Sequence, residues 1–463
     1  MNISTNNLIL NTDSYKASQW LQYPPNTSSV FSYIEARGGQ YSENVFFGIQ
    51  MFIKEYLLAP ITQQMIDEAE WFLSNHGLPF NKAGWEYILN EHDGFLPIRI
   101  KALPEGTVVT TSNIMASVEN TDPLCFWLTS YVETALLRAV WYPTTVATKS
   151  REIKKVIKEY LEMTADEEAM GGLGFKLHDF GARGVSSKES AGIGGCAHLV
   201  NFMGTDTMEG ALYAMRYYNE KDVPGFSVPA SEHSTMTSWM RDGEVEACRN
   251  MFKQFGGKFP IVSVVSDSYD IYNAVENLWG EQLKEMVINS GSTLVVRPDS
   301  GEPAEVVVKV ALLLDATFGS TTNSKGYKVL NNVRILQGDG LNDVADFEKI
   351  LTRLVGYNFS TDNVVFGMGG GLLQQVNRDT SKFAMKASHA VVDGEGRDVF
   401  KDPITDSGKR SKRGRLGSVL VDGVITTVSE EEAGENNLLE VVFENGRLVK
   451  DDTFADIRDR ASV

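Results

Sequence analysis

The sequence predicts an α/β fold, in which an irregular (β/α) barrel is joined to an α+β domain formed from both chain ends. Between about residues 175 and 375, short apolar runs alternate with amphipathic helical stretches, as in a parallel sheet covered by helices on both faces. Nearly every apolar run ends in a polar residue or a glycine-rich turn. The segments on either side differ, with helices mixed among strands of alternating apolar and polar residues.

The repeating units follow one another closely in this central region. Lys176–Gly181 leads into a helix expected to begin near Ser186, and Ile261–Val265 and Thr293–Val296 each precede a further helical stretch. The units end, in chain order, at Asp179, His233, Asp267, Arg297 with Asp299, Asp339 and the turn Gly369–Gly371.

The polar residues that follow the predicted strands favour a barrel over an open sheet. Side chains at the carboxyl ends of barrel strands share one mouth, whereas an open sheet gathers only those near its switch point. A single aspartate after a strand is most often a turn or cap residue. A series of such residues on one rim instead predicts an active site.

The flanks predict the second domain. Ile98–Ala102 alternates as a strand does, and Gly423–Val428 has the pattern of a short antiparallel strand. We therefore expect residues 1–145 to begin the α+β domain, residues 146–390 to form the barrel, and residues 391–463 to return to the α+β domain.

Composition and charge exclude several classes of protein. The chain has 463 residues, of which 42% are hydrophobic, and a net charge of −18. This balance argues against general nucleic-acid binding, which needs a basic face. It still permits a small anionic substrate, because exposed charges are screened beyond about 8 Å and a few local cations then dominate. No apolar stretch approaches the roughly 20 residues of a membrane helix, and the N-terminus lacks the pattern of a signal peptide.

Cysteine and histidine spacing gives no metal motif. Cys125, Cys196 and Cys248 are far apart and form no CxxC pair, so we expect buried thiols in a cytoplasmic protein. The six histidines form no HExxH or comparable cluster. The sequence also lacks GxGxxG and GxxxxGK[ST], the signatures of dinucleotide and P-loop sites.

Two segments predict contact with an anion. The turn Gly367–Gly371 is expected to open a helix, whose N–H groups and positive end favour phosphate. Lys409–Arg415 is the most basic stretch of the chain. Such a run is usually a solvated loop; with a pyrophosphate substrate, the alternative is that it closes over the leaving group.

One set of short motifs occurs in a fixed order from about residue 8 to 460. The motifs are Thr12–Lys16, Lys176–Gly181, Arg183–Ser187, Gly204–Thr207, Val228–Thr235, Val264–Asp270, Arg297–Gly301 and Gln337–Gly340. Together they resemble those of the nicotinamide phosphoribosyltransferases. The chain departs from the family pattern at Ala182, where tyrosine is usual, and at Met368, where serine is usual.

The resemblance implies a reaction and a site for its acceptor. The family transfers the 5-phosphoribosyl group of phosphoribosyl pyrophosphate to nicotinamide, giving nicotinamide mononucleotide and pyrophosphate in NAD salvage. Phe180, and Tyr15 from the partner chain, should stack on the nicotinamide ring, which is worth about 0.5–1.5 kcal/mol beyond area burial. Asp206 should accept from the carboxamide NH₂, and Arg297 should donate to its oxygen or to a nearby phosphate.

This pairing implies selectivity for the amide over the acid. With nicotinate, a second negative charge would lie beside Asp206. At 4 Å and an effective dielectric near 20 the repulsion is about 4 kcal/mol, on the order of a thousandfold. Arg297 would recover part of that energy.

The resemblance also assigns the groups around phosphoribosyl pyrophosphate, where neutralising the leaving pyrophosphate should supply most of the catalysis. The ribose hydroxyls and the neighbouring phosphate would be held by Asp299, Gly338 and Asp339. The 5′-phosphate would be held by Gly369, Gly370 and Arg378. The pyrophosphate would be held by Arg37, Arg183, Lys386 and Lys401. Asp13 joins Tyr15 among the expected substrate-binding residues.

Cofactors and partners follow from the same resemblance. Mg²⁺ is expected to arrive with the pyrophosphate substrate, because this hard cation is bound by carboxylate and phosphate oxygens. His233 matches the histidine that family members phosphorylate with ATP, and Asp267 would orient its imidazole. ATP hydrolysis is therefore expected as an optional coupled activity. The family is homodimeric, with active sites shared between the two chains.

Three alternatives stand beside this interpretation. A nicotinate phosphoribosyltransferase shares the fold and the chemistry, and Asp206 argues against it. A barrel isomerase or lyase for a phosphorylated sugar would use the glycine turn but would not need two stacking aromatics. A non-enzymatic binding or signalling protein would not need the complete set of site residues.

Overall fold

The computed structural model describes residues 6–405 and 410–463, and the chain divides into two compact units. The barrel unit comprises Lys149–Leu212 and Asp222–Val376. The α+β unit comprises the described residues up to Thr148, together with Tyr213–Lys221 and Asn377–Ser462. Each unit has its own sheet.

The limits of the barrel unit differ from the expected boundaries at residues 145 and 390. The unit begins at Lys149 and ends at Val376. The strand β14 (Phe383–Val392) belongs to the other unit, because it pairs antiparallel with β1 (Thr27–Ala36). An apolar run alone does not reveal which sheet a strand will join, so the sequence pattern does not separate β14 from the barrel strands.

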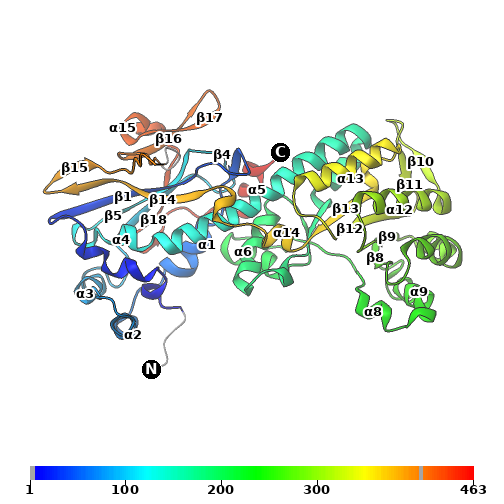
Figure 1. The fold of residues 1–463 in the computed structure, drawn as a ribbon, viewed down its shortest axis with the longest axis horizontal. Coiled ribbons are helices and arrows are strands. Elements are labelled where there is room, and N and C mark those ends of the chain that lie inside the picture. Colours follow the sequence, from blue (N-terminus) through cyan, green and yellow to red (C-terminus); the bar gives the residue numbers. More distant parts are fainter. Residues whose placement is uncertain (1–5, 406–409) are drawn as a thin grey trace. The chain divides into compact units, whose positions relative to one another are not determined.

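The barrel unit is built on a parallel sheet of six strands. They are β6 (Leu177–Asp179), β7 (Gly204–Thr205), β8 (Ile261–Val265), β9 (Thr293–Arg297), β12 (Val333–Gln337) and β13 (Val364–Met368). Their order across the sheet is β7-β6-β13-β12-β9-β8 (Figure 1). Every pairing is parallel, so all the carboxyl ends lie at one edge of the sheet.

One irregular segment links the two outer strands of this sheet. Phe226 makes a parallel bridge to Gly204 of β7, and Ala230 makes one to Ser263 of β8. Backbone hydrogen bonds accompany both bridges. The sheet is thus curled and closed by an irregular segment rather than by regular strands, which confirms the predicted irregular barrel.

Local sequence signals explain where several barrel helices begin. The helix α6 (Lys188–Leu199) is capped by the side chain of Ser187, and α12 (Pro303–Phe318) begins with proline. A capping box at Asp343 starts α13 (Val344–Gly356). The unit also contains α8 (His233–Thr237), α9 (Glu244–Phe255), α10 (Ile271–Asn273), α11 (Lys284–Ser290) and α14 (Gly370–Leu373).

The α+β unit is built on a seven-stranded antiparallel sheet to which both chain ends contribute. Besides β1 and β14, its strands are β3 (Ile98–Ala102), β5 (Ile114–Asn120), β15 (Glu395–Asp398), β18 (Glu440–Glu444) and β19 (Arg447–Leu448). Their order is β15-β14-β1-β5-β3-β18-β19. This arrangement confirms the predicted α+β domain formed from the two ends of the chain.

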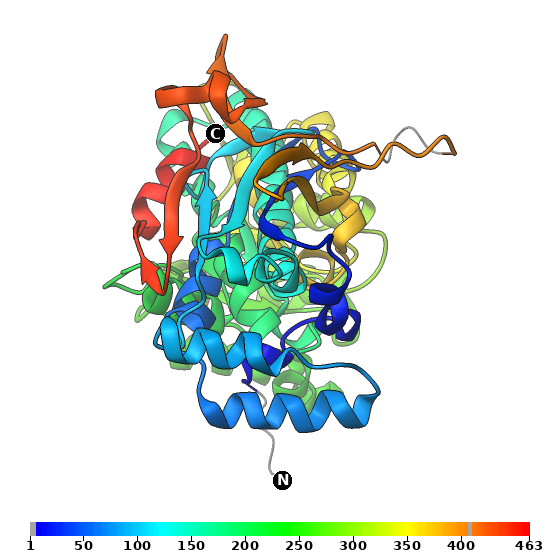
Figure 2. The ribbon, with the colours of Figure 1, turned by 90° about the vertical axis from the view of Figure 1, so that its left-hand side faces the viewer.

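Other elements cover the two sides of this sheet. The helices α2 (Gln63–His76) and α3 (Lys82–Glu91), drawn in blue, lie on one side. The hairpin of β16 (Leu416–Val421) and β17 (Val424–Ser429), drawn in orange, lies on the other side (Figure 1, Figure 2). The sheet is therefore an inner layer of its unit.

The burial of the cysteines and the length and apolar character of the helices can be compared with what the composition predicts. All three cysteines are buried thiols outside any disulfide. Burial raises the pKa of Cys125 and of Cys248 to about 12, so both stay protonated. Within the described residues, no helix combines the length and the apolar character needed to cross a membrane.

Candidate active site

The carboxyl edge of the parallel sheet carries several of the site residues that the sequence and its family resemblance indicated. Asp206 follows β7, Phe180 follows β6, and Gly369 follows β13. Gly338 follows β12, and Arg297 ends β9. The parallel pairing therefore places these residues along one rim, as expected.

Phe180 lies against two glycines at this rim. Its N–H donates to the Met368 carbonyl at 2.9 Å. A Cβ on Gly367 would lie 1.9 Å from Cε2 of the ring, and one on Gly338 would lie 3.4 Å from the same atom. The Phe180 ring can occupy this place only because Gly367 has no side chain.

The guanidinium of Arg297 lies beside the same ring. Its Cζ is 5.6 Å from the centroid of Phe180, within the range of a cation–π interaction. Nη2 donates to Oδ1 of Asp299 at 2.8 Å. Nε is buried and has no hydrogen-bond partner among the described residues. Buried donors are almost always satisfied, so this N–H fits a donor kept for a bound molecule.

Asp206 is held by a residue that the motifs did not single out. Ser227, from the segment that closes the barrel, donates its Oγ–H to Oδ1 of Asp206 at 2.5 Å. No sequence signal links two residues on separate segments in this way. Asp206 is exposed, so solvent screening makes the thousandfold selectivity estimated from Coulomb's law an upper limit.

A buried carboxylate braces the turn below Phe180. Oδ1 of Asp179 accepts from the N–H of Gly181 at 2.7 Å, and the carbonyl of Asp179 accepts from the N–H of Asp206 at 2.9 Å. Burial raises the pKa of Asp179 to about 6, although donors from Gly181 and Thr207 oppose it. Asp179 thereby ties two neighbouring strand ends together.

His233 and Asp267 form a hydrogen-bonded pair. Nε2 of His233 lies 2.8 Å from Oδ1 of Asp267, and Nδ1 lies 3.9 Å from Oδ2 of Asp299. The other Asp267 oxygen accepts from the Asp299 N–H at 3.0 Å and from the Ser300 hydroxyl at 2.6 Å. An Nε2–H donated to Asp267 leaves the imidazole lone pair on Nδ1.

These contacts also set the charge of Asp267. Burial raises its pKa, but hydrogen bonds from Ser300, His233 and the backbone of Asp299 outweigh it. The net pKa lies below the usual value, so the carboxylate is ionised at neutral pH. An ionised, oriented partner is what a histidine needs in order to act as a nucleophile or a base.

The glycine turn after β13 matches its prediction only in part. Gly369 precedes α14 as expected, and the N–H groups of Leu372 and Leu373 close the turn on the Gly369 carbonyl. The helix is however a single turn, because α14 ends at Leu373 and Asn377 starts a separate 3-10 turn. A helix of this length has almost no macrodipole, so within the turn itself the support for a phosphate comes from its backbone N–H groups.

A second turn packs against the glycine turn. A Cβ on Gly184 would lie 3.1 Å from Cα of Gly370. The neighbouring Arg183 is exposed. This packing brings an exposed cation to the backbone of the glycine turn, in keeping with the phosphate-binding roles expected for Arg183 and Gly370.

Lys149 is a further residue at the glycine turn, and the motifs did not include it. Its Nζ donates to the Gly371 carbonyl at 2.6 Å, and its side chain is buried. Burial lowers the pKa of Lys149 to about 8, while Asp343 and Asp346 oppose this. A lone lysine within a long helix, here α5 (Glu133–Thr164), carries no sequence signal, because most such lysines are solvated.

The α+β unit contains a group of four cations, which we call the cation cluster: Arg37, Arg378, Lys386 and Lys401. Arg37 lies just beyond β1, Lys386 lies on β14 opposite Tyr33, and the N–H of Arg37 donates to the Ser381 carbonyl at 3.1 Å. Burial lowers the pKa of Lys386, Glu133 opposes this, and the other three members of the cluster lower it further. Like charges repel at this range, so the cluster fits a site for a multivalent anion.

The segment of Asp13 and Tyr15 lies near the same cluster. Oδ2 of Asp13 accepts from the Thr134 hydroxyl at 2.7 Å, and the neighbouring Glu133 pairs with Lys16. Tyr15 has 57% of its surface exposed. An exposed aromatic of this kind is suited to contact a ligand or a second chain.

The basic stretch near residue 410 is largely neutralised within its own unit. Arg415 pairs with Glu119 at 2.8 Å and with Glu430 at 2.6 Å, and Lys412 pairs with Glu35. Lys409 lies outside the described residues. Lys412 and Arg415 are therefore paired within their unit, whereas Arg410 and Arg413 are exposed, so the role of the whole stretch stays a prediction.

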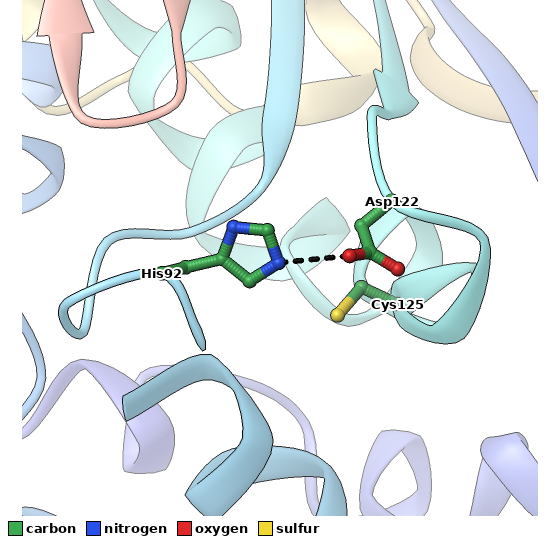
Figure 3. Close-up of side chains that lie close together, drawn as sticks. All are labelled: His92, Asp122 and Cys125. Carbon is green, nitrogen blue, oxygen red and sulfur yellow. Dashed lines mark hydrogen bonds and ion pairs between the residues drawn. The ribbon is translucent and has the colours of Figure 1, made fainter. Parts of the chain in front are cut away.

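One histidine, aspartate and cysteine lie within reach of a common metal ion in the α+β unit (Figure 3). Oδ2 of Asp122 already accepts from Nε2 of His92 at 2.9 Å and from the Tyr87 hydroxyl at 3.0 Å. Its Oδ1 accepts from the Leu124 N–H at 2.8 Å. Cys125 is buried in the core. Hydrogen bonding and packing account for this group, which ties the end of α3 to the turn after β5.

Comparison with known proteins decides the family. Residues 7–100 match the N-terminal domain of nicotinamide phosphoribosyltransferase, and residues 175–447 match the nicotinate phosphoribosyltransferase (NAPRTase) family. The nicotinamide phosphoribosyltransferase of Xanthomonas campestris pv. campestris (strain 8004) is 52% identical, covering 99% of this chain and 98% of the relative. The chain belongs to the nicotinamide phosphoribosyltransferase family.

A more distant relative agrees with this membership, and two solved structures share the fold. The nicotinamide phosphoribosyltransferase of Acinetobacter baylyi is 34% identical, covering 97% of this chain and 95% of the relative. The crystal structure of nicotinate-nucleotide pyrophosphorylase from Pyrococcus furiosus has a TM-score of 0.64 at 17% identity, with 100% and 96% coverage. Human nicotinic acid phosphoribosyltransferase has a TM-score of 0.53, with 97% and 92% coverage. These two structures support the fold described for this chain.

Proposed function

We propose that this member of the nicotinamide phosphoribosyltransferase family transfers the 5-phosphoribosyl group from phosphoribosyl pyrophosphate to nicotinamide. The pyridine nitrogen bonds to C1′ of the ribose while the bond from C1′ to the pyrophosphate oxygen breaks. Pyrophosphate leaves with the electron pair. Family membership supports the reaction. The structural observation that carries it is the ring of Phe180 packed on Gly367, beside an Arg297 guanidinium whose Nε lacks a partner among the described residues.

The barrel mouth would bind the nicotinamide and the ribose. Phe180 would stack on the pyridine ring, and Arg297 would donate Nε–H to the carboxamide oxygen. Asp206, held by Ser227, would accept from the amide NH₂. The ribose hydroxyls would be bound by Asp299, Gly338 and Asp339.

The glycine turn and the cation cluster would bind the phosphates. Gly369, Gly370 and Arg378 would hold the 5′-phosphate. Arg37, Arg183, Lys386 and Lys401 would hold the pyrophosphate and stabilise the charge that it gains as it leaves. Mg²⁺ would arrive on the pyrophosphate, and the carboxylates of Asp299 and Asp339 offer the oxygen donors that this ion prefers.

An ATP-coupled step would use His233. Asp267 orients the imidazole and is ionised at neutral pH, so it would stabilise a phosphorylated histidine formed from ATP. In this proposal the phosphohistidine favours productive pyrophosphate chemistry, and ATP hydrolysis is an optional coupled activity.

We also infer a homodimer in the cytoplasm. Tyr15 is exposed, as a ring donated to the active site of a partner chain would be before assembly. Three buried thiols outside any disulfide support a reducing compartment.

A direct assay tests the proposed reaction. Purified protein is mixed with Mg²⁺, phosphoribosyl pyrophosphate and either nicotinamide or nicotinate, with and without ATP, and the mononucleotide is detected by mass. Product from nicotinamide is expected. Product mainly from nicotinate would keep the fold and the reaction but overturn the role of Asp206. Absence of product from either base would overturn the proposal.

A variant of Arg297 tests whether its Nε–H is the donor to nicotinamide in the proposed reaction. Arg297→Lys keeps the charge but lacks a donor at the position of Nε, so kcat/KM for nicotinamide should fall at least about tenfold. The matched control is Arg353→Lys, because Arg353 forms an exposed ion pair with Glu305. Equal activities of the two variants would show that Nε is not the amide donor.

A further inference from the structure

A buried carboxylate, that of Glu35, lies next to the cation cluster, and its negative charge is opposite in sign to the four cations. Glu35 lies on β1, two residues before Arg37, and only 2% of its surface is exposed. Alternate residues of a strand share a face, so Glu35 is on the same side of β1 as Tyr33. Tyr33 is paired with Lys386 across the two strands. A negative charge at Glu35 is therefore placed to attract the cations that the proposed function assigns to pyrophosphate.

Lys412, rather than a cation of the cluster, forms the ion pair with Glu35. Its Nζ forms an ion pair with the Glu35 carboxylate, and its backbone N–H donates to the Tyr33 hydroxyl at 2.9 Å. The Nζ also lies 5.9 Å from the centroid of the Tyr33 ring. Three contacts to two residues of β1 thus fix Lys412 on the sheet, and the buried carboxylate is neutralised by a cation from outside the cluster.

The segment that carries Lys412 is anchored at both of its ends. Its described parts, residues 399–405 and 410–414, extend from the end of the sheet (Figure 2, orange-brown). The N–H groups of Val399 and Gly414 donate to the Ser388 carbonyl at 2.9 and 2.8 Å, and the Ser388 hydroxyl donates to the Gly414 carbonyl at 2.7 Å. Ser388 is fully buried, two residues after Lys386. The segment is therefore tied to the strand that carries one member of the cluster.

A second connection joins this segment to another member of the cluster. The Ser411 N–H donates to the Lys401 carbonyl at 2.9 Å, and the Ser411 hydroxyl accepts from the Lys401 N–H at 2.8 Å. Ser411 directly precedes Lys412. Ser411 therefore joins the backbone of Lys401 to the segment that places Lys412 on Glu35.

We propose that Lys412 is a positioning residue for the anion site: by pairing with Glu35 it keeps Arg37 and Lys386 available to the pyrophosphate end of the substrate. It does not touch the substrate in this role. Without Lys412, the buried Glu35 carboxylate would need another partner, since an unpaired buried charge is strongly destabilising. Lys386 and Arg37 of the cluster lie at the same face of β1 as Glu35, whereas Arg415 on that face is already paired with Glu119 and Glu430. This inference rests on the proposed function of the cluster.

Lys412→Met tests the proposal, because methionine keeps much of the side-chain volume and removes the charge. Binding of inorganic pyrophosphate is measured by calorimetry, and KM is measured for phosphoribosyl pyrophosphate and for nicotinamide. We expect pyrophosphate to bind at least about tenfold more weakly. KM for phosphoribosyl pyrophosphate should rise by a similar factor, while KM for nicotinamide stays within about twofold.

A double variant separates positioning from folding. In Glu35→Gln/Lys412→Met no carboxylate remains to capture Arg37 or Lys386, so pyrophosphate affinity should return to within about threefold of wild type. Lys349→Met is the control for loss of one positive charge, because Lys349 forms an exposed ion pair with Glu302 on the barrel unit. Thermal unfolding of each variant identifies any that do not fold.

The possible outcomes are distinct. If wild type does not bind pyrophosphate, the proposed function of the cluster fails. If wild type binds it and folded Lys412→Met binds equally well, the positioning role is wrong. If the double variant binds as weakly as Lys412→Met, capture by Glu35 is excluded, and this proposal is overturned even though the proposed function stands.

Discussion

The barrel mouth and the cation cluster are both assigned to one substrate, yet the fold positions their residues in different ways. At the mouth, neighbouring parallel strands end at one edge, so each rim residue is the last residue of a strand or lies one or two positions after it. In the cluster, cations from positions 37 to 401 meet through antiparallel pairing and loop contacts. The positions of the mouth residues are set by the parallel strand topology, whereas the positions of the cluster residues are set by individual hydrogen bonds and ion pairs. Single substitutions should therefore reveal which contacts at each place are indispensable.

The largest loss of activity is expected at Gly367, where the Phe180 ring leaves no space for a side chain. Gly367→Ala would place a Cβ 1.9 Å from Cε2 of Phe180, so the ring must move. A displacement of about 1 Å at a catalytic site costs on the order of a hundredfold in rate, and kcat/KM for nicotinamide should fall by about that factor. The matched control is Gly356→Ala at the end of α13, where an added Cβ meets no atom within 4 Å. Equal kinetics for the two variants would show that the Phe180 ring is not constrained.

The next largest effect concerns selectivity at the mouth. Asp206→Asn removes the negative charge that should repel nicotinate. Because Asp206 is exposed, we expect the ratio of kcat/KM for nicotinamide over nicotinate to fall by about ten- to a hundredfold rather than a thousandfold. Both substrates are measured on the same preparation. An unchanged ratio would place the source of selectivity elsewhere.

A smaller, pH-dependent effect is expected at the glycine turn. Folding lowers the pKa of Lys149 from 10.5 to about 8, so the folded protein loses this ammonium as the pH rises through about 8. Affinity for ribose 5-phosphate, measured by calorimetry, should then weaken by about threefold to tenfold between pH 7 and 9. Lys149→Arg should abolish this pH dependence, because arginine stays charged.

Lys149 also predicts a pH dependence of stability. Between about pH 8 and 10.5 the unfolded chain binds the proton more tightly than the folded chain, so the contribution of Lys149 makes the free energy of unfolding rise with pH. Below about pH 8 the lysine is protonated in both states, and the cost of burying the charge is fully present. Denaturation of wild type and Lys149→Met across this range isolates the contribution. Identical slopes for the two proteins would contradict the shifted pKa.

The smallest effect on turnover is expected from the histidine. His233→Ala removes the imidazole that Asp267 orients at 2.8 Å, so the ratio of rates with and without ATP should fall to about one. Initial rates at fixed phosphoribosyl pyrophosphate measure this ratio. Undiminished stimulation by ATP would remove the phosphohistidine from the proposal.

How far the sequence alone could go follows from the same comparison. The alternation of apolar runs with helical stretches predicted the barrel, and Arg297 followed from the position of a strand end. Phe180 and Asp206 followed from the resemblance to the family motifs. The contacts of Ser227 with Asp206 and of Lys149 with Gly371 join segments that are distant in sequence, and no local pattern encodes such a meeting. The single-turn length of α14 was missed because a glycine-rich turn signals where a helix starts but not where it ends.

The strand order of the α+β unit has a consequence for how the chain is made. β1 pairs with β14, and β3 pairs with β18, so this sheet cannot be completed until the chain as far as Glu444 has left the ribosome. The barrel sheet uses strands between Leu177 and Met368 only and is fully translated earlier. Pairings of such long sequence separation form slowly, and chains generally fold domain by domain during synthesis. The N-terminal strands must therefore wait, with an unpaired edge, while the barrel unit is synthesised between them and their partners.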